Sequence, residues 1–119
     1  MARVRERLLV VDDDQSVRTL ICEALRLADF ECVEAASGFE AIHALKDPAI
    51  SLVVLDLSMP GMDGHSTLAQ MRSTRDSRPV LVVTARQDPV DLATSFEAGA
   101  DDYLRKPFSV EELAWRCRS

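Results

Sequence analysis

The chain has 119 residues, of which 47% are hydrophobic and 29% charged, so it is long enough for one domain with a single core and lacks the composition of a disordered protein. The formal net charge of −6 at pH 7 and the isoelectric point near 4.8 argue against direct contact with nucleic acid, because binding to phosphates needs clustered Lys and Arg side chains. No apolar run approaches the length of a membrane span, so we expect no contact with a membrane.

Short apolar runs alternate with helical patterns along the whole chain. Strands are predicted at residues 8–11, 32–35, 52–55, 80–83 and 103–104, and their mostly aliphatic side chains are typical of strands buried on both faces. The longest helical pattern follows the first strand and has an apolar stripe at Val17, Leu20, Ile21, Ala24, Leu25 and Ala28. Shorter patterns follow at Ile42/Leu45, Leu68/Met71, Leu92/Ala93/Phe96 and Val110/Leu113/Cys117, with Gly38, Gly64 and Gly99 at junctions. Five β-α units predict an α/β fold with a parallel sheet between helices.

Polar residues follow the predicted strands at the carboxyl ends, where sheets of this kind bind their ligands. They are Asp12, Asp13, Asp56, Thr84 and Lys106. Carboxylates that face one point suit Mg²⁺, a hard cation that prefers oxygen ligands and keeps some of its waters. A lysine and a hydroxyl nearby complete a cradle for a phosphoryl group, whose oxygens need positive charge. The sequence therefore predicts a magnesium-dependent phosphoryl site at this edge of the sheet.

The residue type at position 106 supports this interpretation. The chain has twelve arginines but only two lysines, Lys46 and Lys106. A lysine directly after Arg105 indicates a need for a compact point charge rather than a planar guanidinium.

The three cysteines, Cys22, Cys32 and Cys117, are odd in number and show no CxxC spacing. This usage is typical of reduced thiols in a cytoplasmic protein, and it indicates neither a zinc site nor a disulfide framework.

Four segments, LLVVDDDQSVR, VVLDLSMPGMDG, VLVVTAR and GADDYLRKPFS, stand in this order between residues 8 and 109, so they are spread over nearly the whole chain. Together they resemble the receiver domain of two-component response regulators. The resemblance implies a flavodoxin-like, doubly wound five-stranded parallel sheet of order 2-1-3-4-5 with helices on both faces. It also implies that Asp56 accepts a phosphoryl group from a sensor histidine kinase, and that the protein catalyses its own phosphorylation and dephosphorylation without being an enzyme for another substrate.

The resemblance assigns further roles one residue at a time. It implies that Asp13 and Asp56 bind Mg²⁺, or Mn²⁺ in its place, directly, that Asp12 acts through water, and that Ser58 offers its backbone carbonyl. Thr84 and Lys106 would hold the phosphoryl group, and Tyr103 would be an aromatic switch that moves with Thr84. The peptide bond between Lys106 and Pro107 is expected to be cis, because Lys106 must turn back over the site.

The output is expected to pass through the fourth helix, the fifth strand and the fifth helix. Candidate residues on this face are Asp101, Asp102, Trp115, Arg116 and Arg118. The chain is expected to be a receiver domain over residues 1–119, cut within its last helix, with a DNA-binding effector domain after it. Related regulators form phosphorylation-dependent homodimers through charged pairs on this face. The segment DPVDLATSFEAG contains no Lys or Arg, however, so we expect a weak or absent dimer.

Several alternatives stay open. Asp14 is expected to cap the first helix rather than bind metal, and His43 and His65 to be solvated. Arg86 either overhangs the site or is simply exposed, and Trp115 either contacts a partner or is an ordinary surface aromatic. Other functions are a stand-alone receiver that docks on a partner protein, a phosphorylation-independent interaction module, and a phosphatase with an aspartate nucleophile. The phosphatase is disfavoured because Leu57-Ser58 follows Asp56, with no second carboxylate two residues on.

Overall fold

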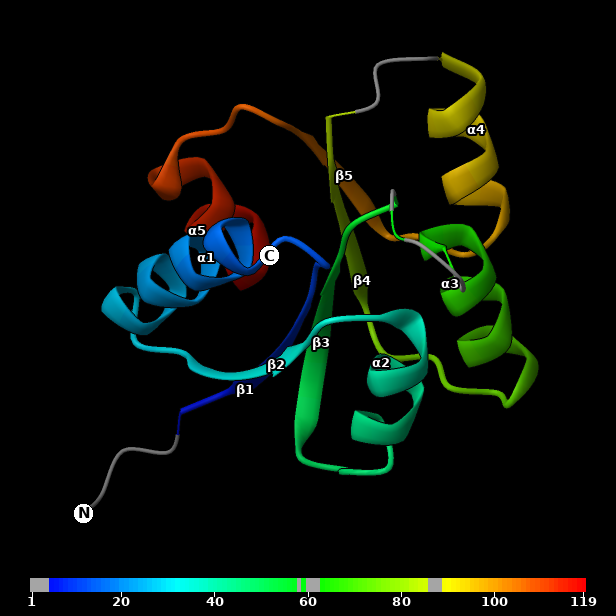
Figure 1. Ribbon diagram of the computed structural model, residues 1–119, viewed down its shortest axis with the longest axis horizontal. Helices are drawn as coiled ribbons and strands as arrows, with labels where there is room; N and C mark the ends of the chain where they lie inside the picture. Colours follow the sequence, from blue (N-terminus) through cyan, green and yellow to red (C-terminus); the bar gives the residue numbers. More distant parts are fainter. Residues whose placement is uncertain (1–4, 58, 60–62, 86–88) are drawn as a thin grey trace.

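A five-stranded parallel sheet forms the centre of the computed structural model, which describes residues 5–57, 59, 63–85 and 89–119 (Figure 1). Its strands lie in the order β2-β1-β3-β4-β5, as the resemblance implied. Their bounds are Arg7–Val11 (β1), Glu31–Ala35 (β2), Ile50–Leu55 (β3), Val80–Thr84 (β4) and Asp102–Arg105 (β5). Each predicted strand is therefore present, and the bounds differ from the predicted ones by at most two residues.

Helices cover both faces of the sheet (Figure 1). On one face lie α1 (Gln15–Leu27) and α5 (Val110–Arg118), and on the other lie α2 (Gly38–Ala44), α3 (Gly64–Ser73) and α4 (Pro89–Glu97). Along β1, Leu8 and Val10 pack towards α1 and α5, whereas Leu9 and Val11 pack towards α2 and α3. All four side chains are essentially inaccessible to solvent, which explains why β1 is apolar at every position after Arg7.

Side-chain oxygens cap the first turn of four helices. Asp14, Ser37, Asp63 and Ser109 each accept hydrogen bonds from backbone N–H groups at the start of α1, α2, α3 and α5. The cap expected at Asp14 is thereby confirmed. Because its carboxylate accepts from the N–H groups of Ser16 and Val17, it fixes the direction of α1 directly after Asp12 and Asp13.

Two predicted apolar stripes are wrong in part. In α1, Ile21 and Leu25 are fully buried as predicted, and Val17, Ala24 and Ala28 pack partly buried against the same core. Leu20, however, is 54% exposed, and Cys22 is buried in its place. The stripe at Leu92, Ala93 and Phe96 in α4 is exposed.

Among the α4 side chains that the structure describes, residues 92–97, Ser95 is the buried one, and its hydroxyl lies 3.0 Å from His65 Nε2 of α3. A hydrogen bond of this kind lets a polar side chain replace an apolar one at a helix contact. The expectation that His65 is simply solvated is therefore wrong, whereas His43 is exposed as expected.

Candidate functional site

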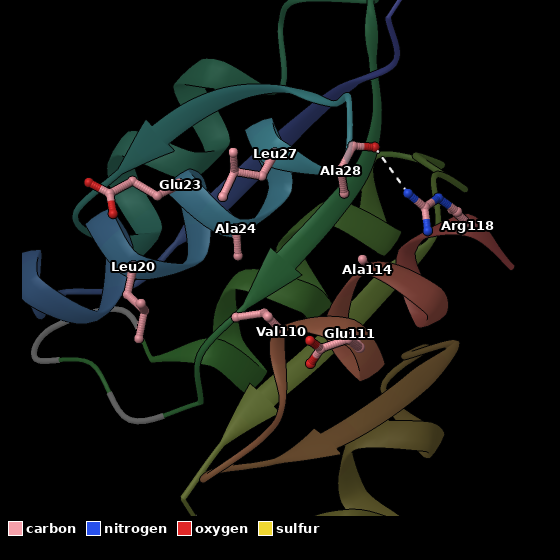
Figure 2. Close-up of a pocket in the computed structure, with 9 residues that line it drawn as sticks. All are labelled: Leu20, Glu23, Ala24, Leu27, Ala28, Val110, Glu111, Ala114 and Arg118. Atoms are coloured by element: carbon pink, nitrogen blue, oxygen red, sulfur yellow. Dashed lines mark hydrogen bonds between the residues drawn. The ribbon is translucent and has the colours of Figure 1, made fainter.

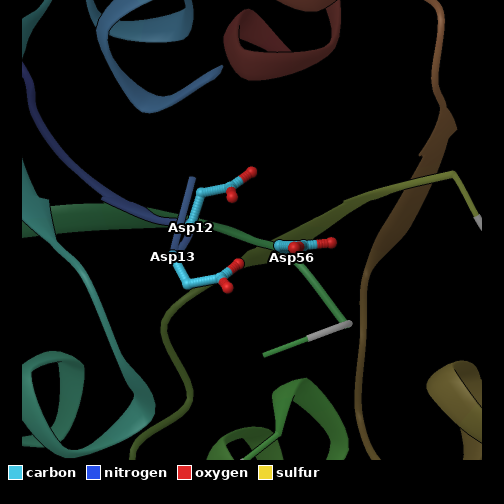
Figure 3. Close-up of side chains that lie close together, drawn as sticks. All are labelled: Asp12, Asp13 and Asp56. Atoms are coloured by element: carbon cyan, nitrogen blue, oxygen red, sulfur yellow. The ribbon is translucent and has the colours of Figure 1, made fainter. Parts of the chain in front are cut away.

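Three carboxylates meet at the carboxyl ends of neighbouring strands. Val11 and Leu55 are paired in register at the ends of β1 and β3, so the residues that follow them, Asp12 and Asp56, leave the sheet side by side. Oxygen atoms of Asp12, Asp13 and Asp56 all lie within 4.8 Å of one another, and Figure 3 shows the three side chains projecting in the same direction. Asp12 and Asp56 are buried, and Asp13 is exposed. The predicted acidic cluster is therefore formed.

Lys106 approaches this cluster from β5. Its Nζ donates to Asp12 Oδ2 at 3.0 Å and lies 3.9 Å from Asp56 Oδ1. The backbone N–H of Lys106 donates to the carbonyl of Thr84, which ties the end of β5 to the end of β4. The Lys106–Pro107 peptide bond is cis, as expected. Three carboxylates facing one ammonium leave an excess of negative charge, which a divalent cation would offset.

Arg18 holds the Asp12 backbone, although the sequence analysis did not single it out. Its Nη1 donates to the Asp12 carbonyl at 2.6 Å, and its Nε donates to Glu34 of β2. The Asp12 carboxylate also accepts from the N–H of Asp14. These bonds restrict the rotation of Asp12, so Arg18 is a positioning residue. The sequence did carry a signal for this role, because Arg18 ends the segment LLVVDDDQSVR and lies one turn into α1, close in sequence to Asp12.

Gly64 presses directly on the backbone of Asp56. A Cβ atom on Gly64 would lie 2.4 Å from the carbonyl oxygen of Asp56 and 2.5 Å from Leu57 Cα, and both contacts are with backbone. The Gly64 N–H donates to the Leu57 carbonyl at 3.0 Å. The first turn of α3 therefore packs against the chain that carries Asp56, and only glycine fits there. Gly64 was predicted to lie at a junction between elements, whereas its contact with the Asp56 backbone was not predicted.

The two residues expected to act as switches lie on β4 and β5. Thr84 is fully buried at the end of β4, and Tyr103 is partly buried and packs against the core on the α2 and α3 side. Tyr103 and Val82 are paired across the two strands. Their roles stay predictions. Ser58 and Arg86 lie outside the described residues.

Charged residues on the expected output face already form ion pairs within the chain. Arg116 Nη1 donates to both carboxylate oxygens of Asp102 at 2.9 Å, and Arg72 pairs with Asp101. Trp115 is 64% exposed, with the Arg116 guanidinium 5.8 Å from its ring centroid. Arg118 does not belong to this face, because it donates to the Ala28 carbonyl at the end of α1. Its suggested place among the dimer charges is therefore corrected.

A groove of about 390 Å³ lies between α1 and α5 (Figure 2). Leu20, Leu27 and Val110 line it with exposed apolar side chains, and Arg118 lies at one end. Neither leucine was predicted to line a surface groove, because Leu20 belonged to the predicted apolar stripe and Leu27 lay outside it. The acidic cluster is not among the residues that line this groove.

Comparison with known proteins agrees with this geometry. The model of the response regulator receiver domain family matches residues 8–118. "Probable transcriptional regulator ycf27" of Porphyridium aerugineum is 41% identical over 97% of the chain, and "Response regulator MprA" of Mycobacterium sp. (strain KMS) is 42% identical over 95%. The chain spans only 48% and 49% of the length of these two relatives.

A solved structure shows the same fold. The CheY-like response regulator receiver domain protein of Methanospirillum hungatei superposes with a TM-score of 0.90 at 25% identity, over 97% of this chain and 92% of that one. Within the described ranges, no helix has the length and apolar character needed to cross a membrane.

Proposed function

Because this chain belongs to the response regulator receiver domain family, we propose that it is a phosphorylation-dependent switch in which Asp56 accepts a phosphoryl group from a sensor histidine kinase. One observation carries the proposal. The Asp56 carboxylate is nearly buried, yet it lies among the oxygens of Asp12 and Asp13 and 3.9 Å from the ammonium of Lys106. A carboxylate placed among groups that bind cations and anions is suited to receive a phosphoryl group.

The acidic cluster fits Mg²⁺. Its ligands are carboxylate oxygens, which hard divalent cations prefer, and their spacing lets several of them reach one ion. We assign direct contacts to Asp13 and Asp56 and a water-mediated contact to Asp12, with Mn²⁺ as a substitute; the carbonyl of Ser58 is a further proposed ligand. When bound, the ion supplies positive charge that offsets the repulsion between these carboxylates and the incoming phosphoryl oxygens.

The residues of the chain have separate roles in the transfer. A carboxylate oxygen of Asp56 attacks phosphorus and forms an O–P bond, while the bond between phosphorus and the donor atom breaks and its electron pair leaves with the donor. Lys106 donates to a phosphoryl oxygen and thereby stabilises charge that builds up in transfer. Asp12 holds Lys106 in reach before the donor arrives. Hydrolysis of the same acyl phosphate returns the protein to its starting state.

The switch acts through the added charge. A phosphoryl group brings roughly −1.5 to −2 charges to the strand ends, which attracts the hydroxyl of Thr84. We propose that the loop after Thr84 follows and that Tyr103 turns into the vacated space. The change then reaches the face formed by α4, β5 and α5, where Phe96 and Trp115 are exposed.

We propose an attached DNA-binding effector domain as the recipient of this change. Two observations support it: the chain spans about half the length of its relatives, and one of these relatives carries the name of a transcriptional regulator. The negative charge of the chain places any DNA contact in the effector domain. A cytoplasmic location follows from the same proposal, because both DNA and kinase are reached there.

Mass spectrometry of the intact protein tests the phosphoacceptor. Acetyl phosphate with Mg²⁺ should add one phosphoryl group per chain, and a chelator should prevent the addition. Asp56→Asn should abolish it. The matched control is Asp14→Asn, because Asn also caps a helix and residue 14 lies outside the acidic cluster. Full labelling of Asp56→Asn, or none of the wild type, would contradict the proposal.

A further inference from the structure

Two cysteines from different elements meet between α1 and the sheet. Cys22 lies in α1 and Cys32 in β2, and both pack in the core on the α1 and α5 side. The Cys32 thiol donates to the Cys22 carbonyl oxygen, with 3.9 Å between Cys32 Sγ and that oxygen, and the two side chains are close enough for each to shift the pKa of the other. We propose that Cys22 and Cys32 are a peroxide-oxidisable thiol pair that closes an intramolecular disulfide between α1 and β2.

The two thiols differ in access to solvent. Cys22 is fully buried, whereas Cys32 is only partly buried, on a strand at the edge of the sheet. A small oxidant such as hydrogen peroxide therefore reaches Cys32 first. The buried Cys22 thiol lies next to it and is available to react with the oxidised sulfur. This is the arrangement of a reactive thiol beside a resolving one.

The pKa shifts of the two thiols also favour Cys32 as the thiol that reacts first. The neighbouring Cys22 thiol favours the thiolate of Cys32 and lowers its pKa, and the charge of Arg26 in α1 adds to this effect. The neighbouring Cys32 side chain and burial raise the pKa of Cys22. Because the thiolate is the nucleophile, Cys32 is the sulfur that attacks the oxidant.

The reaction balances in two steps. The Cys32 thiolate attacks one peroxide oxygen, an S–O bond forms, the O–O bond breaks, and hydroxide leaves to be protonated, which gives a sulfenic acid. The Cys22 sulfur then attacks the Cys32 sulfur, an S–S bond forms, and the S–O bond breaks. The departing hydroxide takes the Cys22 proton and leaves as water. The two thiols together lose two electrons and two protons, and one peroxide is reduced to two waters.

Cys117 provides an internal comparison. It lies in α5, is 4% exposed, and burial raises its pKa to about 12. At neutral pH it therefore stays a protonated thiol with little access to solvent. We expect Cys117 to remain reduced while the other two cysteines are oxidised.

Peptide mapping of the wild-type protein tests the proposal. The reduced protein is treated with hydrogen peroxide, remaining thiols are alkylated after unfolding, and the chain is digested with trypsin without reduction. Cleavage after Arg18, Arg26 and Lys46 places the two cysteines in separate peptides, residues 19–26 and 27–46. A linked pair of these peptides should appear and should be lost after reduction. The intact monomer should become lighter by about 2 Da.

Three variants resolve the roles. Cys117→Ala should form the same disulfide, Cys32→Ala should form none, and Cys22→Ala should accumulate a sulfenic acid at residue 32 that dimedone traps. Three alkylated cysteines in the treated wild type, a link that includes Cys117, or a link between two chains would overturn the proposal. The wild-type digest decides the matter even where a variant fails to fold.

Discussion

The ammonium of Lys106 lies closer to Asp12 than to Asp56, at 3.0 Å from Asp12 Oδ2 and 3.9 Å from Asp56 Oδ1. Lys106 therefore neutralises the neighbour of the proposed phosphoacceptor more than the phosphoacceptor itself. If a phosphoryl group forms on Asp56, Lys106 must exchange part of its interaction with Asp12 for one with a phosphoryl oxygen. Two opposite effects follow from removing its charge.

Lys106→Gln should slow phosphorylation by acetyl phosphate about 100-fold, because one charged donor to the transferring group is lost. The same change should strengthen Mg²⁺ binding several-fold, since it removes a cation that repels the ion. Phosphorylation rates by mass spectrometry and Mg²⁺ affinity by calorimetry measure the two effects. Lys46→Gln is the control, because Lys46 is the other lysine and is exposed. Weaker Mg²⁺ binding in Lys106→Gln would show that the lysine supports the metal site instead.

Gly64→Ala should damage the site through the backbone. The added Cβ would overlap the Asp56 carbonyl and Leu57 Cα, and neither contact can be relieved by a side-chain rotation. We expect a loss of about 1–3 kcal/mol in the free energy of unfolding, the usual cost of overpacking, together with slower phosphorylation. Chemical denaturation and the labelling assay measure these effects. Ser66→Ala, on the exposed side of the same helix turn, should change neither, and an equally stable Gly64→Ala would refute the close contact.

Arg78 should contribute strongly to the free energy of unfolding. It lies just before β4 and so at the amino ends of the strands, opposite the site. Its guanidinium donates to the carbonyls of Leu45, Asp47 and Ile50 and forms an ion pair with Asp76. Arg78→Met would leave these acceptors without their donor, so we expect a loss of about 2–4 kcal/mol. Arg78→Lys should recover only part of it, because an ammonium cannot reproduce the planar fork. Urea denaturation measures both, and full recovery by Lys would contradict the multidentate role.

The ion pair between Arg78 and Asp76 should make the free energy of unfolding depend on pH. The hydrogen bond from Arg78 holds the pKa of Asp76 below its ordinary value. The Asp76 carboxylate therefore contributes its full stabilisation above the pKa of the unfolded chain, about 3.9, and loses it as the pH falls through the lower native pKa. The difference in unfolding free energy between wild type and Asp76→Asn should be constant above about pH 5 and shrink below pH 4. A difference that grows on acidification would contradict this sign.

The sequence predicted the strands and the acidic cluster because both depend on local patterns. Uninterrupted apolar runs marked strands buried on both faces, and carboxylates placed directly after them had to meet at one edge of a parallel sheet. The positions of Asp12, Asp13, Asp56 and Lys106 therefore followed from topology alone.

The supporting contacts could not be predicted in the same way, because they depend on three-dimensional packing. Arg18 reaches the Asp12 carbonyl from α1, and Gly64 fits because α3 begins against the chain after β3. The phase of α4 was wrong because its contact with α3 uses the polar pair His65 and Ser95, which an apolar stripe does not reveal. Hydrophobic periodicity locates a helix more reliably than it orients a weakly amphipathic one.

The phosphorylated domain should remain largely monomeric. Dimers that use charged pairs across α4, β5 and α5 need free charges on both partners, yet Asp102 and Arg116 already pair with each other inside the chain. The α4 sequence also carries no Lys or Arg to pair with a second copy. Exchanging an internal ion pair for an equivalent external one gains little free energy, since partly exposed pairs are each worth about 1 kcal/mol or less.

Sedimentation velocity in acetyl phosphate and Mg²⁺ tests this expectation at micromolar concentration, with Asp56→Asn under the same conditions as the unphosphorylated reference. Arg116→Ala should leave the sedimentation coefficient unchanged and should lower the free energy of unfolding by less than about 1 kcal/mol, because the Asp102–Arg116 pair is partly exposed to solvent. If the wild type instead sediments as a tight dimer and Arg116→Ala restores the monomer, then Arg116 must leave Asp102 on phosphorylation. The internal ion pair would in that case be the element that phosphorylation breaks.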